Sequence, residues 1–202
     1  MEAYVLDTSL FTNPETYTQF GENSQAAIAT FLDLAQDSGA RFYMPSSVYR
    51  ELKQIKDLGA LAAQFEAVVR LRSPRKSSLA IPAEILYEFI DEVRTRIDRG
   101  LKVAEEHARL GSGEGVDAGA VINRLRERYR ETLRQGIIDS REDVDVLLLA
   151  FELDATVVTA DEGLRRWADK VGVQWVTCGH FRQVLEALGR IHRSERLIPP
   201  SL

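Results

Sequence analysis

Two aspartates follow short apolar runs at distant places in the 202-residue chain. Asp7 comes directly after the run at 3–6, and Asp161 closes the stretch ATVVTAD at 155–161. If both runs are parallel strands, their carboxyl ends meet at one edge of a sheet, where ligands bind in such folds. Each aspartate alone is equally well explained as the N-cap of a following helix. The pair therefore predicts either a shared carboxylate cleft or two helix caps.

More acids lie in the segment IIDSREDVDVLLLAFEL at 137–153. We expect it to become helical after a capping box formed by Ser140 and Asp143. At 100° per residue, Asp143 shares a face with the aliphatic side chains. Asp139, four residues earlier, points roughly the same way. Asp145 and Glu152 fall on the opposite face, which we expect to be charged and solvated. Asp139 and Asp143 are therefore the candidates to join the strand-end aspartates.

Crowded carboxylates repel one another and resist ionisation, and a bound divalent cation reverses this effect. A set of oxygen ligands suits Mg²⁺ or Mn²⁺. The three histidines are scattered and Cys178 is the single cysteine, so the sequence predicts neither a zinc site nor a disulfide. The glycine-rich GSGEG at 111–115 lacks the Lys-Ser/Thr ending of a phosphate-binding Walker loop. The chemistry predicted is therefore that of a magnesium or manganese site.

Strand and helix patterns alternate along the chain, which predicts an α/β fold with a parallel sheet. Glycines are expected to end two of the helices, at Gly39 and Gly172. The strands are expected at 3–6, 41–45, 155–161 and 173–178, the helices at 24–39, 46–55, 60–72, 161–172 and 181–191, and an extended tail at 193–202.

Residues 82–110 and 116–135 show helical spacing without any strand pattern, and the turn at 111–115 joins them. This arrangement predicts a helical hairpin whose second helix ends at Gly136. Two helices extended from an α/β body cannot bury both apolar stripes on themselves, so we expect self-association. The stripes comprise Leu86, Phe89, Ile90, Val93, Leu125, Tyr129 and Leu133.

The net charge of −5 and the pI of about 5.4 argue against a nucleic-acid binder. However, 21 of the 26 basic residues are arginines, which suit phosphate, although a GC-rich genome explains the same bias. On the second hairpin helix, arginines could grip RNA or could simply form a solvated face; they are Arg124, Arg126, Arg128, Arg130 and Arg134. Without a membrane-length apolar run or a signal-peptide pattern, we expect a cytoplasmic protein.

The motifs VLDTS, PSSVYREL and DSREDVDVLLLAFELDATVVTADEGL, in this order, resemble the PIN domain, a metal-dependent nuclease fold. With the opening LDTSLFTNP and the long hairpin, the chain resembles the minimal protein-only ribonuclease P family, also known as RNA ligase partner proteins. The resemblance implies a PIN-like three-layer fold with a central parallel sheet. The nuclease domain would comprise 1–81 and 136–202, and 82–135 would be an inserted hairpin for oligomerisation or tRNA contact.

The resemblance further implies a metal-dependent endoribonuclease that removes the 5′ leader of precursor tRNA and assembles into a homo-oligomer without an antitoxin. Glu51 matches a glutamate of many PIN domains, although a solvated charge on a helix is an equally simple interpretation. Whether Asp145 belongs to the acidic site is left open. The residues implied to bind Mg²⁺ or Mn²⁺ and to carry catalysis are Asp7, Asp139, Asp143 and Asp161.

Two other functions fit part of the pattern. A toxin-type PIN endoribonuclease shares the acidic site and cuts tRNA or ribosomal RNA internally, but it usually lacks the long hairpin. A non-catalytic scaffold for RNA or protein would have no reason to keep four matched acids. Cleavage of a precursor tRNA discriminates the first of these alternatives, and Mn²⁺ titration discriminates the second.

Overall fold

The computed structural model describes residues 2–113, 115–134, 138 and 140–197. The chain forms two compact units. The sheet unit comprises Met1–Leu79 with Ser140–Leu202, and the hairpin unit comprises Ala80–Asp139. None of the helices in the described ranges carries an apolar stretch that could cross a bilayer.

A five-stranded parallel sheet forms the centre of the sheet unit, in the order β3-β2-β1-β4-β5. The parallel α/β fold predicted from the sequence is thus confirmed. The strands are β1 Ala3–Leu6, β2 Arg41–Met44, β3 Val69–Leu71, β4 Thr156–Thr159 and β5 Trp175–Thr177.

Strand β3 is the one the sequence pattern did not predict. The helix expected at 60–72 instead breaks into a 3₁₀ turn at Gly59–Leu61, helix α5 at Ala62–Val68 and this short strand. Val69 pairs with Phe42 at the sheet edge and is fully buried. Sheet pairing therefore overrides a helical apolar spacing in these three residues.

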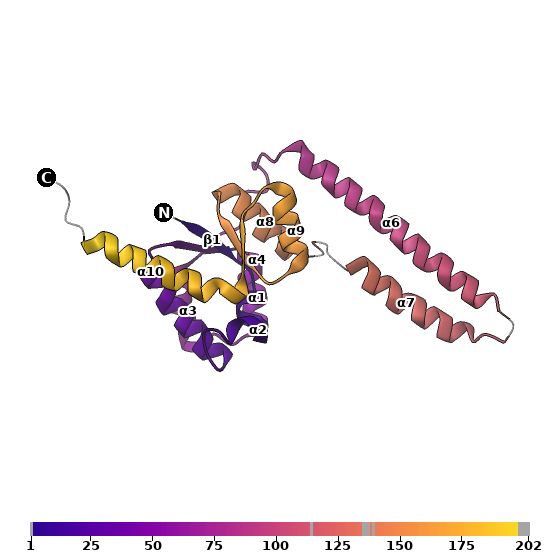
Figure 1. The fold of residues 1–202 in the computed structure, drawn as a ribbon, viewed down its shortest axis with the longest axis horizontal. Coiled ribbons are helices and arrows are strands. Elements are labelled where there is room, and N and C mark those ends of the chain that lie inside the picture. The colour runs from indigo at the N-terminus through magenta and orange to yellow at the C-terminus, as the bar shows by residue number, and fades with distance from the viewer. Residues whose placement is uncertain (1, 114, 135–137, 139, 198–202) are drawn as a thin grey trace. The chain divides into compact units, whose positions relative to one another are not determined.

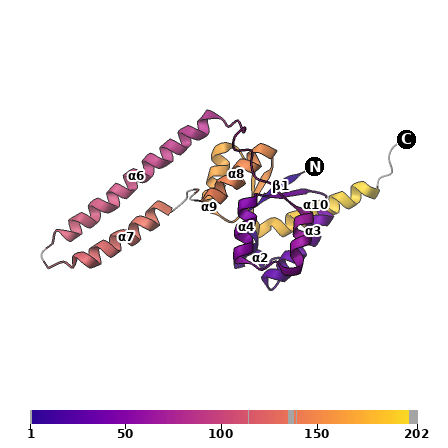
Figure 2. The ribbon, with the colours of Figure 1, turned by 180° about the vertical axis from the view of Figure 1, so that it is seen from behind.

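Helices cover both faces of the sheet (Figures 1 and 2). On one face α3 and α10 pack together, and Phe31 and Phe181 both contact Phe42 of β2 edge-to-face. On the other face α8 packs against β1 and β4 and touches α4 and α9. The helices are α1 Ser9–Thr12, α2 Pro14–Tyr17, α3 Ser24–Ser38, α4 Ser46–Ile55, α8 Arg141–Leu153, α9 Glu162–Val171 and α10 Phe181–Leu197.

The predicted helix ends at Gly39 and Gly172 are confirmed, because both glycines adopt the left-handed conformation that terminates α3 and α9. The extended tail predicted from residue 193 is wrong as far as Leu197, since α10 continues to that residue. The remaining part of the predicted tail, 198–202, lies outside the described residues.

The hairpin unit consists of α6 Ala83–Gly111 and α7 Ala118–Arg134, which pack against each other as predicted. Tyr129 lies over Gly100, where a Cβ atom would stand 2.9 Å from the tyrosine ring. Between the helices Arg96 donates a hydrogen bond to the carbonyl of Leu133. The expected helix end at Gly136 lies outside the described residues.

Candidate active site

Asp7 continues the chain from the carboxyl end of β1, and its N–H still donates to the Val158 carbonyl of β4 at 3.1 Å. Its side chain is buried, with two hydroxyl groups donating to Oδ2: Ser9 at 2.6 Å and Thr159 at 2.7 Å. Asp7 is not a helix cap, because Thr8 occupies the N-cap position of α1. The carboxylate is therefore held by hydroxyl groups from the first residue of α1 and the last residue of β4.

Asp161 lies beyond the end of the neighbouring strand β4 and does cap a helix, since its Oδ1 accepts the Leu164 N–H at 2.7 Å. Its own N–H donates to Thr159 Oγ1 at 2.9 Å. The Thr159 hydroxyl thus donates to Asp7 while accepting from Asp161, and it ties the two aspartate loops together. Oδ2 of Asp161 makes no hydrogen bond within the described ranges.

Glu51, on α4, faces two other acids. Burial raises the pKa of its carboxyl, and the negative charges of Asp7 and Glu142 raise it further. Glu51 is half-buried, so its surroundings differ from those of a fully exposed helix charge. Glu142, in the first turn of α8, was not singled out from the sequence; the only hint was the density of acids in REDVD. The charges of two acids from other elements thus act on the Glu51 carboxyl.

The helix that carries Asp143 begins at the predicted cap residue, and one of the two hydrogen bonds of the predicted capping box is present. Ser140 is the N-cap of α8, and its Oγ accepts the Asp143 N–H at 2.9 Å. Asp143 is half-buried in the first turn. Asp139 lies outside the described residues, so the structure does not place it beside the others. Within the described ranges, no three Asp, Glu, His or Cys side chains stand close enough to hold a metal ion.

The expectation that Asp145 and Glu152 lie on a solvated face is wrong. Asp145 is 4% exposed, with Ser47 Oγ donating to Oδ2 at 2.7 Å and Lys76 Nζ standing 2.6 Å from Oδ1. The Glu152 side chain is 2% exposed, covered by ion pairs with Arg72 and Arg75. All three cations come from the segment that follows β3. The angular positions of residues around one helix could not predict this burial, because the side chains that bury the two acids come from another segment of the chain.

Cys178 lies beside this arrangement without taking a chemical part in it. Its Sγ is 3.7 Å from Ser9 Oγ. Burial is the main cause that raises the pKa of its thiol to about 12, and the charge of Asp7 adds to the shift. The thiol therefore stays protonated at neutral pH and is not an activated nucleophile.

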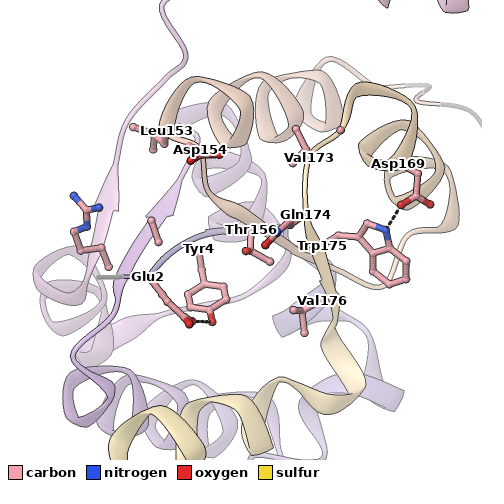
Figure 3. Close-up of a pocket in the computed structure, with 13 residues that line it drawn as sticks. Glu2, Tyr4, Leu153, Asp154, Thr156, Asp169, Val173, Gln174, Trp175 and Val176 are labelled. Carbon is pink, nitrogen blue, oxygen red and sulfur yellow. Dashed lines mark hydrogen bonds between the residues drawn. The ribbon is translucent and has the colours of Figure 1, made fainter. Parts of the chain in front are cut away.

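A pocket of about 830 Å³ opens at the opposite edge of the sheet, at the amino ends of β1, β4 and β5 (Figure 3). Glu2, Tyr4, Thr156 and Trp175 are among its lining residues. In open parallel sheets ligands bind beyond the carboxyl ends of the strands. The candidate active site is therefore the place where Asp7 and Asp161 follow the carboxyl ends of β1 and β4, rather than this pocket.

Comparison with known proteins places these features in a family. Residues 3–190 match the PINc domain ribonuclease family. A protein of Nitrosococcus oceani named RNA-free ribonuclease P is 57% identical over 198 residues, which cover 97% of this chain and 100% of the relative. A protein of the same name from Thermococcus onnurineus is 44% identical over 187 residues, covering 92% of this chain and 94% of the relative.

Proposed function

The chain belongs to the PINc domain ribonuclease family, and we propose that it is an RNA-free ribonuclease P that removes the 5′ leader of precursor tRNA. The observation that carries this proposal is the length of the similarity. Relatives with this name are matched along almost their whole chains, including the stretch that forms the α6–α7 hairpin. A likeness to the nuclease body alone would support only a PIN nuclease of unspecified substrate.

The donor set fits a hard divalent cation, Mg²⁺ or Mn²⁺. Asp7 offers Oδ1, which among the described residues accepts one hydrogen bond, a long one of 3.4 Å from Thr8, and Asp161 offers Oδ2. Mg²⁺ usually binds through one or two carboxylates together with substrate phosphates, so a preformed cage of three acids is not required. When bound, the cation supplies water activation and charge stabilisation at the phosphate. Asp139 and Asp143 complete the proposed ligand set.

The chain's own residues fix the orientation of the reacting groups. Ser9 and Thr159 both donate to Oδ2 of Asp7, and these hydrogen bonds restrict rotation of the carboxylate. The direction of Oδ1 is therefore set by the fold. Glu51 holds a proton to higher pH than an exposed glutamate does, because burial and neighbouring acids oppose its ionisation. In-line hydrolysis at this site leaves a 5′-phosphate on the tRNA and a 3′-hydroxyl on the leader.

The hairpin unit is proposed to mediate assembly and RNA contact. Leu86, Phe89 and Ile97 of α6 are 58%, 52% and 64% exposed, which supports contact with a second copy of the chain. Arginines on the neighbouring helix α7 are exposed and are proposed to contact phosphates of the tRNA; they are Arg124, Arg126, Arg128 and Arg130.

The decisive experiment incubates the protein with a 5′-labelled precursor tRNA, in Mg²⁺ and in EDTA. We expect one labelled product of leader length in Mg²⁺ and none in EDTA. Cuts in the anticodon loop would instead indicate a toxin-type PIN endoribonuclease. Intact RNA under every condition, together with no Mn²⁺ binding in a titration, would indicate a non-catalytic scaffold.

A further inference from the structure

Arg165 is a half-buried cation in the first half of α9, and it has no carboxylate partner within the described ranges. It lies one turn after Asp161 in α9, and its Nε donates a long hydrogen bond of 3.4 Å to the Asp161 carbonyl. Two other arginines of the sheet unit have acidic partners: Arg166 pairs with Glu162 at 2.5 Å and Arg182 with Glu186 at 2.8 Å. The charge of Arg165 is thus left available to a ligand.

Trp175, which also lines the pocket at the amino ends of the strands, contacts the Arg165 guanidinium. The guanidinium carbon lies 5.3 Å from the ring centre of Trp175, within cation–π range. The Trp175 indole is itself fixed, because its Nε1 donates to Asp169 Oδ1 at 2.7 Å (Figure 3). Contacts through Nε and through the guanidinium face leave both terminal nitrogens to donate elsewhere. A guanidinium held in this way loses less rotational freedom when it binds an anion.

Arg165 and Asp7 both influence the thiol of Cys178. The positive charge of Arg165 lowers the pKa of this thiol, which the charge of Asp7 raises. The Cys178 sulfur in turn lies 3.7 Å from Ser9, the residue that donates to Asp7. An RNA backbone that approaches the carboxylates of the candidate site is repelled by them, and the fixed cation of Arg165 offsets that repulsion.

We propose that Arg165 binds a backbone phosphate next to the scissile bond through its terminal nitrogens, and that Trp175 is the residue that positions it. The inference rests on the proposed function for the identity of the RNA. The geometry suits phosphate in particular, because a planar guanidinium donates two parallel hydrogen bonds to it.

Binding of precursor tRNA in EDTA tests this without any cleavage. Arg165→Ala should weaken binding about tenfold, as for loss of a charge-assisted contact, and should flatten the logarithmic salt slope by about one unit. Arg165→Lys should keep most of the slope while losing affinity, because an ammonium cannot bind in the bidentate way. The matched control is Arg166→Ala, which removes an exposed arginine already paired with Glu162 and should leave the slope unchanged.

A double-mutant cycle tests the role of Trp175. Trp175→Leu should weaken binding in the wild-type background and have no further effect in the Arg165→Ala background. A wild-type salt slope for Arg165→Ala, or a lower melting temperature as its only change, would overturn the inference. Leader removal by the wild-type protein in Mg²⁺ is measured separately. If no leader is removed, the proposed function is wrong, and the binding data still decide whether Arg165 contacts RNA.

Discussion

At the scale of single residues, Asp7 is the most completely fixed acid of the candidate site. Asp7→Asn keeps the size of the side chain and one oxygen that can accept from Ser9 or Thr159, but it removes the charge. We expect leader removal to fall by about a hundredfold or more, because charge stabilisation at the phosphate is lost. The melting temperature should change by only a few degrees. Single-turnover cleavage and thermal melting measure both effects.

Asp143 and Asp145 make a matched pair, since they lie two residues apart in α8 but have different surroundings. Asp143→Asn should abolish cleavage with little change in stability. Asp145→Asn should leave cleavage within a few-fold and lower the free energy of unfolding by about 1–2 kcal/mol, because it weakens the contacts to Ser47 and Lys76. A variant Asp145→Asn that melts normally yet does not cleave would place this carboxylate in the active site instead.

The sequence predicted the strand-end aspartates because the carboxyl end of a strand can be read from local pattern alone. It did not predict the hydroxyl groups that hold Asp7, although Thr159 lies only two residues before Asp161. A hydrogen bond across 152 positions, from Thr159 to Asp7, has no local pattern. The burial of Asp145 was missed for the same reason, because its cover comes from Lys76.

At the scale of elements, the segment after β3 is attached to α8 through Glu152. The backbone N–H of Arg75 donates to Oε2 at 2.8 Å, and with the charges of Arg72 and Arg75 it lowers the pKa of this carboxyl. A carboxyl with a lowered folded-state pKa stabilises the fold above its unfolded value of about 4.3 and loses this contribution as the pH falls. Glu152→Gln should therefore be less stable at pH 7, by about 1 kcal/mol since both arginines are partly exposed.

The check is a pair of denaturation series, for wild type and Glu152→Gln, from pH 7 to pH 3. The two curves should converge as the wild-type carboxylate becomes protonated. A difference in stability that stays constant across this range would mean that packing, rather than charge, holds the segment.

Element types were predictable where the apolar spacing is long, as in α3, α6 and α8. They were not predictable in β3, which spans three residues and owes its conformation to pairing with β2. A strand of this length carries too few positions for an alternating pattern to be distinguished from a helical one. The length of α10 was underestimated as well. This helix packs against α3 and continues to Leu197, beyond the end that its sequence pattern predicted.

At the scale of the whole molecule, the apolar face of α6 determines the expected assembly. Phe89 is 52% exposed, and we expect it to be buried between copies of the chain. Phe89→Ser should therefore lower the mass measured by light scattering at micromolar concentration. Lys102→Ser, a change at an exposed polar position of the same helix, serves as the control and should keep the wild-type mass. A monomeric wild-type protein would contradict the prediction outright.

We expect assembly and RNA binding to be linked, because an acidic chain with a net charge of −5 would attract a polyanion better if several copies presented their arginines together. Arg128→Ala should weaken precursor tRNA binding and flatten the salt slope by about one unit, as for one lost phosphate contact. Arg128 stands 3.6 Å from Glu131 in a surface ion pair, so Glu131→Gln should instead leave binding equal or tighter. Each variant's mass is measured alongside, because dissociation of the oligomer would lower affinity indirectly. An unchanged slope at unchanged mass would make Arg128 a solubilising charge, and the RNA contact would then have to come from other arginines.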